Sequence, residues 1–175
     1  MEGYKDNSGF NAVFGSGGGG GSTPTNYNGS FFSVTTQVAG GVLTESYVSL
    51  EVTDFSNGII ISGTDFSQIT FENDGIYALN FSIQLDNQGG GSGEDFIVYL
   101  IKNGSKLPDS ATRYVVQSSS RFQVCSLDFL LNISAGDYIQ IGYVVDDVDI
   151  VLLFESSVGV YPDIPSVICN VFNVG

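Results

Sequence analysis

A short run of carboxylates is the best candidate for a chemical site in this sequence. Asp146, Asp147 and Asp149 lie within four consecutive positions, and hard carboxylate oxygens are the ligands that calcium prefers. The run lacks the spacing of a recognised calcium-binding loop, so a solvated acidic loop is the competing interpretation. Calcium is the one cofactor that the sequence suggests.

Few other residues in the sequence could catalyse a reaction. The chain contains no histidine, which removes the commonest general base and metal ligand and rules out any triad built on an imidazole. Paired carboxylates can hydrolyse glycosides, but nothing around these acids singles out one with a raised pKa. We therefore predict no catalytic residue and no enzymatic activity. The acids considered for such a pair are Asp146, Asp147, Asp149 and Glu155, or Glu94 and Asp95.

The two cysteines do not suggest a metal site. Cys125 and Cys169 are 44 positions apart and lie in apolar runs without other soft ligands, whereas zinc sites need several cysteine or histidine ligands. We expect both to be buried free thiols, because free cysteine behaves as a small apolar residue.

The charge of the chain excludes two classes of partner. It has 19 acidic and 5 basic residues, for a formal net charge of −14. Nucleic-acid binding depends on lysine and arginine that neutralise phosphates, and an anionic membrane surface repels an acidic protein. No apolar run approaches the ~20 residues that a membrane-spanning helix needs. We predict neither nucleic-acid binding nor membrane insertion.

Alternating apolar residues predict an all-β fold. In the segment 75–86, Tyr77, Leu79 and Phe81 alternate with small or polar residues, the pattern of a strand with one buried face. Turn residues such as Asn103-Gly104 separate the apolar segments. Many short strands with such turns are typical of a sandwich or barrel. We expect strands at about 31–38, 46–53, 58–62, 67–72, 75–86, 95–103, 111–118, 120–133, 137–145, 148–156 and 165–174.

The N-terminal residues differ in composition from the rest. Residues 15–22 read GSGGGGGS, a flexible spacer. Before them, Phe10, Val13 and Phe14 form a short apolar patch, which we interpret as an anchor that docks on another protein. A disordered terminus is the competing interpretation. The predicted organisation is an anchor peptide and linker over 1–29 and a head domain over 30–175.

The order of motifs resembles the tumour necrosis factor-like family, and especially the complement globular head. Gly75-Ile76-Tyr77 matches the family's G-x-Y turn, and the segment 130–137 (LLNISAGD) matches its leucine-rich strand followed by "aGD". The resemblance covers about residues 30–175. It implies a ten-stranded jelly roll that assembles as a tight trimer and binds partners through loops or grooves between subunits.

Some apolar residues fall on the wrong side of their strands for the core. Ile76, Phe122, Val124 and Leu130 lie off the predicted core face, which makes them candidates for a subunit interface. A second buried layer within one subunit is the competing explanation. The resemblance adds Phe172, which matches the aromatic residue of the family's last strand.

Two functions are consistent with these features. The first is a non-enzymatic virion protein, such as a fibre head, spike or capsid decoration protein. It would attach to other capsid or fibre proteins by its N-terminal arm, and its trimeric head would bind a host receptor or glycan or stabilise the capsid. The Gly-, Ser- and Asn-rich composition and the absence of an apolar signal segment at the start motivate this hypothesis. The second is a secreted or cell-surface recognition head of the complement or tumour necrosis factor type, which binds protein or glycan.

Overall fold

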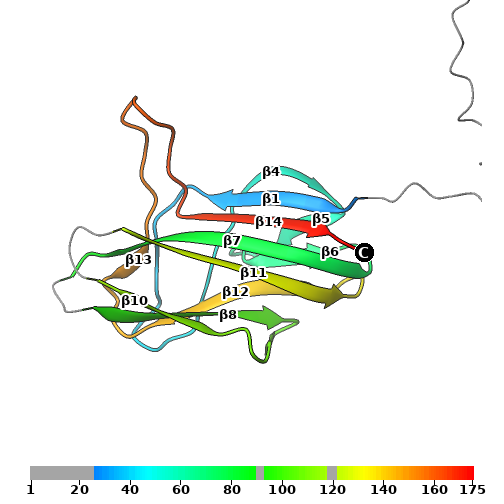
Figure 1. Ribbon diagram of the computed structural model, residues 1–175, viewed down its shortest axis with the longest axis horizontal. Helices are drawn as coiled ribbons and strands as arrows, with labels where there is room; N and C mark the ends of the chain where they lie inside the picture. Colours follow the sequence, from blue (N-terminus) through cyan, green and yellow to red (C-terminus); the bar gives the residue numbers. More distant parts are fainter. Residues whose placement is uncertain (1–25, 90–92, 118–121) are drawn as a thin grey trace, which may run out of the picture.

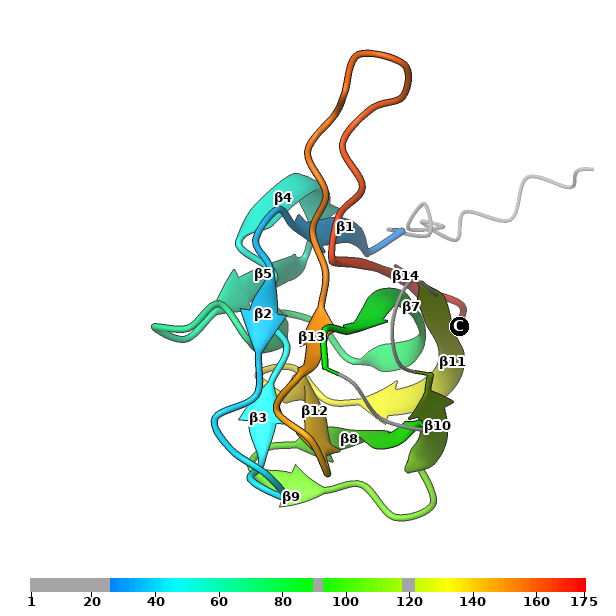
Figure 2. The same ribbon diagram turned by 90° about the vertical axis from the view of Figure 1, so that its left-hand side faces the viewer.

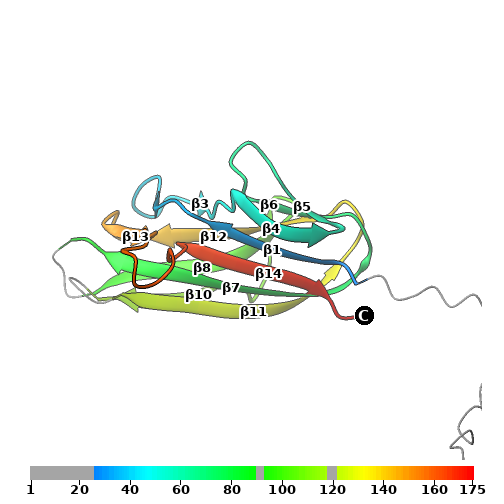
Figure 3. The same cartoon turned by 90° about the horizontal axis from the view of Figure 1, so that it is seen from above.

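The chain folds into a β-sandwich. A computed structural model describes residues 26–89, 93–117 and 122–175, and within them fourteen strands form two antiparallel sheets that face each other (Figure 1). Seen from above, the strands of both sheets run along the long axis of the molecule, and one sheet lies partly behind the other (Figure 3). In the described ranges no helix is long and apolar enough to cross a membrane.

The first sheet, called sheet A, is organised around its longest strand. β7 pairs with β11 along one edge, and its other edge pairs with β14 and then with β13. β1 and β4 continue the sheet beyond β14, and β2 pairs with β13. The strands of sheet A are β1 (Asn28–Ser33), β2 (Gln37–Val38), β4 (Val52–Asn57), β7 (Gly75–Asn87), β11 (Gln123–Ile133), β13 (Ile150–Leu152) and β14 (Val167–Asn173).

The second sheet, sheet B, has the order β10-β8-β12-β6-β5, with β3 paired to β12 and β9 paired to β8. Asn103 and Gly104 both have positive φ, 51° and 77°, and connect β8 to β9. This confirms the tight turn predicted from the Asn-Gly pair. The strands of sheet B are β3 (Ser46–Tyr47), β5 (Ile59–Ser62), β6 (Gln68–Phe71), β8 (Glu94–Lys102), β9 (Ser105–Lys106), β10 (Thr112–Val116) and β12 (Tyr138–Val145).

The predicted alternation along β7 is confirmed. Its inward side chains fill the space between the sheets, because successive side chains of a strand point to opposite faces. β12 contributes in the same way from the facing sheet. On β11, Leu127 and Phe129 are only partly buried, since this strand forms an edge of sheet A. The buried residues of β7 and β12 that form the core between the sheets are Tyr77, Leu79, Phe81, Ile83, Leu85, Ile139, Ile141, Tyr143 and Val145.

Two predicted strands are each divided in two. The segment predicted as one strand at 31–38 becomes β1 and β2, which pair with different partners. Between them, Glu51 accepts hydrogen bonds from the backbone N–H of Val34 at 2.7 Å and from the Ser33 hydroxyl at 3.1 Å. This carboxylate replaces a strand partner, and the chain turns here. The segment predicted at 46–53 divides similarly into β3 and β4. β1 also begins at Asn28, two residues before the predicted domain boundary.

β8 is buried on both faces, as its sequence predicts. Phe96 and Leu100 point into the core, and Tyr99 and Ile101 are buried on the opposite side. Tyr99 lies over Gly142 of the neighbouring strand, where an added Cβ would be 2.9 Å from the tyrosine ring. The ring therefore takes the space that a side chain at position 142 would occupy.

A carboxylate fixes this tyrosine at the surface of sheet B. Glu45 accepts hydrogen bonds from the hydroxyl groups of Tyr99 at 2.7 Å and Tyr47 at 2.8 Å, and Lys106 lies 3.0 Å away. The Tyr99 hydrogen bond, followed by those of Lys106 and Tyr47, lowers the pKa of Glu45 to about 2. The cluster ties the segment before β3 to β8 and β9.

Truncation of the core side of β7 should destabilise the fold. Leu79 is fully buried, and Leu→Ala substitutions at such sites cost about 2–5 kcal/mol because a cavity remains. We expect Leu79→Ala to lower the free energy of unfolding by that amount in urea denaturation. Val38→Ala, at an exposed position of β2, should change it by less than about 0.5 kcal/mol. Equal effects of the two substitutions would contradict this placement of the core.

The Glu45 cluster should make stability depend on acidity. Because the pKa of Glu45 is lowered from 4.5 to about 2 on folding, its contribution is fully present above the higher value and is lost as pH falls through the lower one. We expect Glu45→Gln to reduce the loss of stability between pH 5 and pH 2, measured by urea denaturation at several pH values. An unchanged pH profile in this variant would show that Glu45 is not held as the structure shows.

Candidate functional site

The side of sheet A that points away from the core is the candidate site. This surface, the outward face, is formed by alternate residues of three neighbouring strands. Their registers place them in rows across the sheet, such as Leu130, Ala78 and Phe172. The outward face comprises Ile76, Ala78, Asn80, Ser82, Gln84 and Asp86 of β7, Val124, Ser126, Asp128, Leu130 and Asn132 of β11, Ile168, Asn170 and Phe172 of β14, and Phe122 just before β11.

All five residues predicted for a subunit interface lie on the outward face, in two groups. Ile76, Leu130 and Phe172 lie together at the end nearest the C-terminus, where β7 begins and β11 and β14 end (Figure 1). Phe122 and Val124 lie at the opposite end of β11. The sequence pattern did not single out Ile168, which is also exposed on this face.

These apolar side chains are exposed. Leu130 is 74% exposed, Phe122 is 59% exposed and Ile76 is 47% exposed. A second buried layer within one subunit, the competing interpretation of the sequence, is therefore wrong for these residues. Ala78 is buried between its two row neighbours, Leu130 and Phe172, so the larger side chains form one continuous surface around it.

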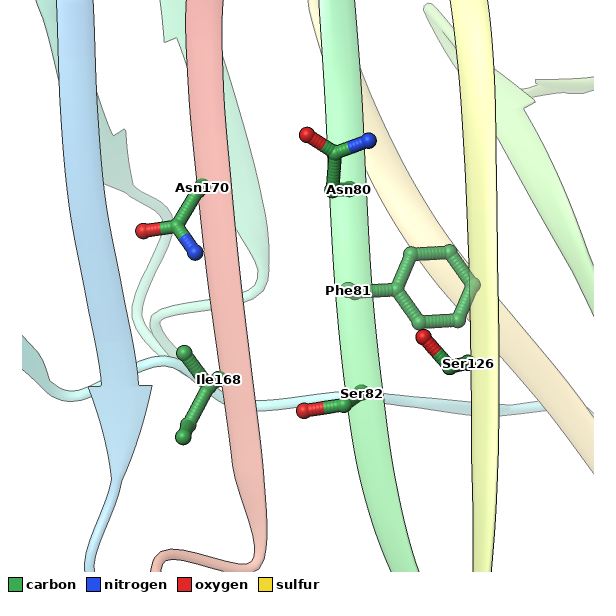
Figure 4. A pocket seen from close by; sticks show the side chains of 6 residues that line it. All are labelled: Asn80, Phe81, Ser82, Ser126, Ile168 and Asn170. Carbon is green, nitrogen blue, oxygen red and sulfur yellow. The ribbon is translucent and has the colours of Figure 1, made fainter.

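A polar band separates the two apolar groups. Asn80, Asp128 and Asn170 form one row, and the Asn80 amide donates to the Asp128 carboxylate at 3.5 Å. In the next row, the short side chains of Ser82 and Ser126 leave a shallow hollow of about 150 Å³ (Figure 4). Drug-sized ligands occupy pockets of about 300–1,000 Å³, so this hollow is too small to enclose one. A wider hollow of about 470 Å³ lies beside it on the same face, over Ala78, Asn80, Asp128 and Leu130.

The outward face carries little charge. Asp86 and Asp128 are its two ionisable residues, although the chain has 19 acidic residues. The three basic side chains in the described ranges all lie on sheet B, where Lys102, Lys106 and Arg113 pair with Asp137, Glu45 and Asp95. A general acid and base pair needs two titratable groups within reach of each other, whereas Asp86 and Asp128 lie three rows apart on this face.

The acidic run lies in the turn between β12 and β13. The Asp146 carboxylate accepts the backbone N–H of Asp95 at 2.6 Å, and that of Asp147 accepts the N–H of Asp149 at 2.9 Å. These hydrogen bonds shape the turn. Within the described residues, no group of three acidic, cysteine or histidine side chains is arranged around an ion site. Calcium binding by Asp146, Asp147 and Asp149 stays a prediction.

The two cysteines are free and buried, which confirms the expectation from the sequence. Burial raises the pKa of the Cys125 thiol to about 11 and that of Cys169 to about 12. Nucleophilic cysteine chemistry needs the thiolate, which neither residue forms near neutral pH. The predicted anchor residues Phe10, Val13 and Phe14 lie outside the described residues.

A scan against protein-family models finds no match, and a search of curated proteins finds no match either.

Solved structures share its fold. The globular domain of zebrafish complement 1qA protein matches with a TM-score of 0.56 and 15% identity, covering 86% of this chain and 98% of that one. Murine APRIL matches with a TM-score of 0.51 and 11% identity, covering 85% and 99%. At these sequence identities, the likeness shows a shared fold and nothing further. The chain has the jelly-roll fold of the complement globular heads and the tumour necrosis factor family, as its sequence predicts.

Proposed function

We propose that this protein is a non-enzymatic recognition head that self-associates as a trimer through the outward face of sheet A. The observation that carries the proposal is the combination of exposed apolar groups and little charge on this one face. The likeness of the fold to complement and tumour necrosis factor-family heads supports the recognition role.

The composition of the outward face favours an interface between copies. The buried centres of protein interfaces are depleted in charged residues and enriched in aromatic ones, and this face has two ionisable residues, Asp86 and Asp128, beside Phe122 and Phe172. A closed cyclic assembly brings the same face of every copy to the interior. Self-association would thus remove Leu130, Ile76 and Phe172 of each copy from water together.

The polar band would set how the copies align. Asn80, Asn170 and the paired serines are hydrogen-bonding groups in the middle of an apolar surface. Polar groups buried at an interface are costly unless they find partners, so only alignments that pair them are favourable. In this proposal the apolar groups provide affinity, and Asp128 with its amide neighbours provides specificity.

The same residues support a non-enzymatic function. The outward face lacks an acid and base pair, both thiols are buried with raised pKa values, and the chain has no histidine. A recognition head needs none of these groups. Its partner would be a protein or a glycan outside the cell, bound by the exposed loops at the ends of the sandwich.

The virion hypothesis from the sequence stays a prediction. The fold comparisons favour the recognition head instead, because both matched structures belong to that class of fold. If the protein is a virion component, mass spectrometry will detect it in purified particles in a fixed ratio to the capsid proteins. Its absence from particles would leave the recognition head as the remaining hypothesis.

Light scattering after size-exclusion chromatography tests the assembly. We expect the wild-type chain to show three times the 18.6 kDa mass of one copy. Leu130→Asp would place an unpaired carboxylate in the interface of every copy, at a cost of several kcal/mol each. This variant should therefore run as a monomer at concentrations where the wild type is a trimer.

Ile60→Asp is the matched control, because Ile60 is an exposed apolar residue on β5 of the opposite sheet. We expect this variant to remain trimeric. Circular dichroism should show that both variants keep the β-sheet spectrum of the wild type. A wild-type protein that is monomeric at all concentrations would refute the proposal, and so would a trimer unaffected by Leu130→Asp.

A further inference from the structure

The segment that joins β13 to β14 leaves the body of the sandwich as a narrow protrusion (Figures 1 and 2). Glu155 and Ile164 pair at its base, with N–O distances of 3.0 and 2.9 Å in the two directions. We call residues 155–164 the finger. The sequence predicts a strand at 148–156 and a chain break at Tyr161-Pro162-Asp163. The structure instead ends β13 at Leu152.

Hydrogen bonds fix the shape of the finger. The backbone N–H of Ser157 donates to the Asp163 carboxylate at 2.6 Å, and the Ser157 hydroxyl donates to the Tyr161 carbonyl at 2.6 Å. The same hydroxyl accepts the N–H of Gly159 at 3.0 Å, and Gly159 has a φ of 87°, which favours glycine. These contacts connect the two sides of the finger above its base.

The tip of the finger is apolar. Val160 is 90% exposed and Val158 is 69% exposed, and Tyr161 next to them is exposed too. None of the three belongs to the hydrophobic core. Single exposed apolar residues are ordinary, but three of them gathered on a protrusion form a surface suited to contact with another molecule.

The finger lies beside the outward face. In the view along the sandwich, it extends upward past β1 and β4, whereas β7 and β11, which carry most of the outward face, lie to the right of its base (Figure 2). Its base is continuous with the outward face through a hollow of about 90 Å³ lined by Gln84, Phe122, Leu153, Glu155 and Ile164. The finger therefore borders the end of the face that carries Phe122.

The finger is long enough to reach a neighbouring molecule. Each side has about five residues, which reach roughly 15 Å when extended at ~3.3 Å per residue. Sheets that pack face to face lie ~10 Å apart. A copy that covers Gln84 and Phe122 would lie next to the base of the finger, and its further parts would lie within the length of the finger.

We propose that the finger is an assembly arm that contacts a second copy of this chain through Val158, Val160 and Tyr161. The inference rests on the proposed self-association through the outward face. Continuity of the finger with that face favours a second copy over an unrelated partner, because the copy that covers Phe122 must also pass beside the finger.

Crosslinking from the tip tests the contact directly. Val160→Cys introduces an exposed thiol, whereas Cys125 and Cys169 are buried with raised pKa values and react slowly. The full-length variant is labelled with a maleimide-linked benzophenone and illuminated. We expect a covalent dimer, and mass spectrometry of mixed ¹⁵N- and ¹⁴N-labelled chains should show that the crosslink joins two copies.

Substitution of the tip measures its contribution. The triple variant Val158→Ser, Val160→Ser and Tyr161→Ser leaves Ser157, Gly159 and Asp163 in place, so the shape of the finger is kept. We expect its trimer to dissociate at protein concentrations at least tenfold higher than the wild type in a light-scattering dilution series. The control variant carries Val38→Ser, Val42→Ser and Ile60→Ser, at exposed positions away from the finger, and should dissociate as the wild type does.

The outcomes separate the two proposals. If the wild type is trimeric, and the tip neither crosslinks to another copy nor affects dissociation, the assembly arm is refuted and the proposed interface stands. If the wild type is monomeric at every concentration, the proposed interface is refuted, and the arm with it. Crosslinks confined within one chain of a trimer also refute the arm.

Discussion

The structure depends on the pairing of β7 along both of its edges. This strand has β11 on one side and β14 and β13 on the other, so its direction determines which residues of all four strands face the core. Because side chains alternate, burying Tyr77, Leu79 and Phe81 forces Ile76, Ala78 and Asn80 outward. One constraint thus creates both the core and the outward face, and a shift of register by one residue would exchange them.

The same constraint explains what the sequence could predict. Alternation along β7 and β12 is visible in the sequence, and it correctly identifies the residues that fill the core. It does not predict the burial of Ala78, Gln140 and Gly142 on the other side of these strands. The alternation of the neighbouring segment, which becomes β11, likewise predicts Leu130 and Phe122 to lie away from the core. The turn at Asn103-Gly104 could also be predicted, because this residue pair tolerates the positive φ angles that a tight turn needs.

Features that depend on distant contacts could not be predicted in this way. Glu51 divides β1 from β2 by binding the backbone 17 positions earlier, and Glu45 holds Tyr99, which is 54 positions away. No local sequence pattern indicates either contact.

The finger could not be predicted for a related reason. Ser157, Tyr161 and Asp163 have the composition of an ordinary loop, and only the structure shows the hydrogen bonds between them. Sequence patterns also leave the assembly undetermined, because they show that a surface is apolar but not what covers it.

Two sets of residues have different roles in the finger. Backbone pairing at its base and the contacts of Ser157 and Asp163 determine its shape, while Val158, Val160 and Tyr161 determine only what it displays. Neither set belongs to the hydrophobic core of the sandwich. The displayed residues can therefore diverge freely during evolution, or be replaced by a designer, without eroding the stability of the head. If the finger contacts a second copy as proposed, such a separation would let a lineage alter which copies assemble together while the fold itself is conserved.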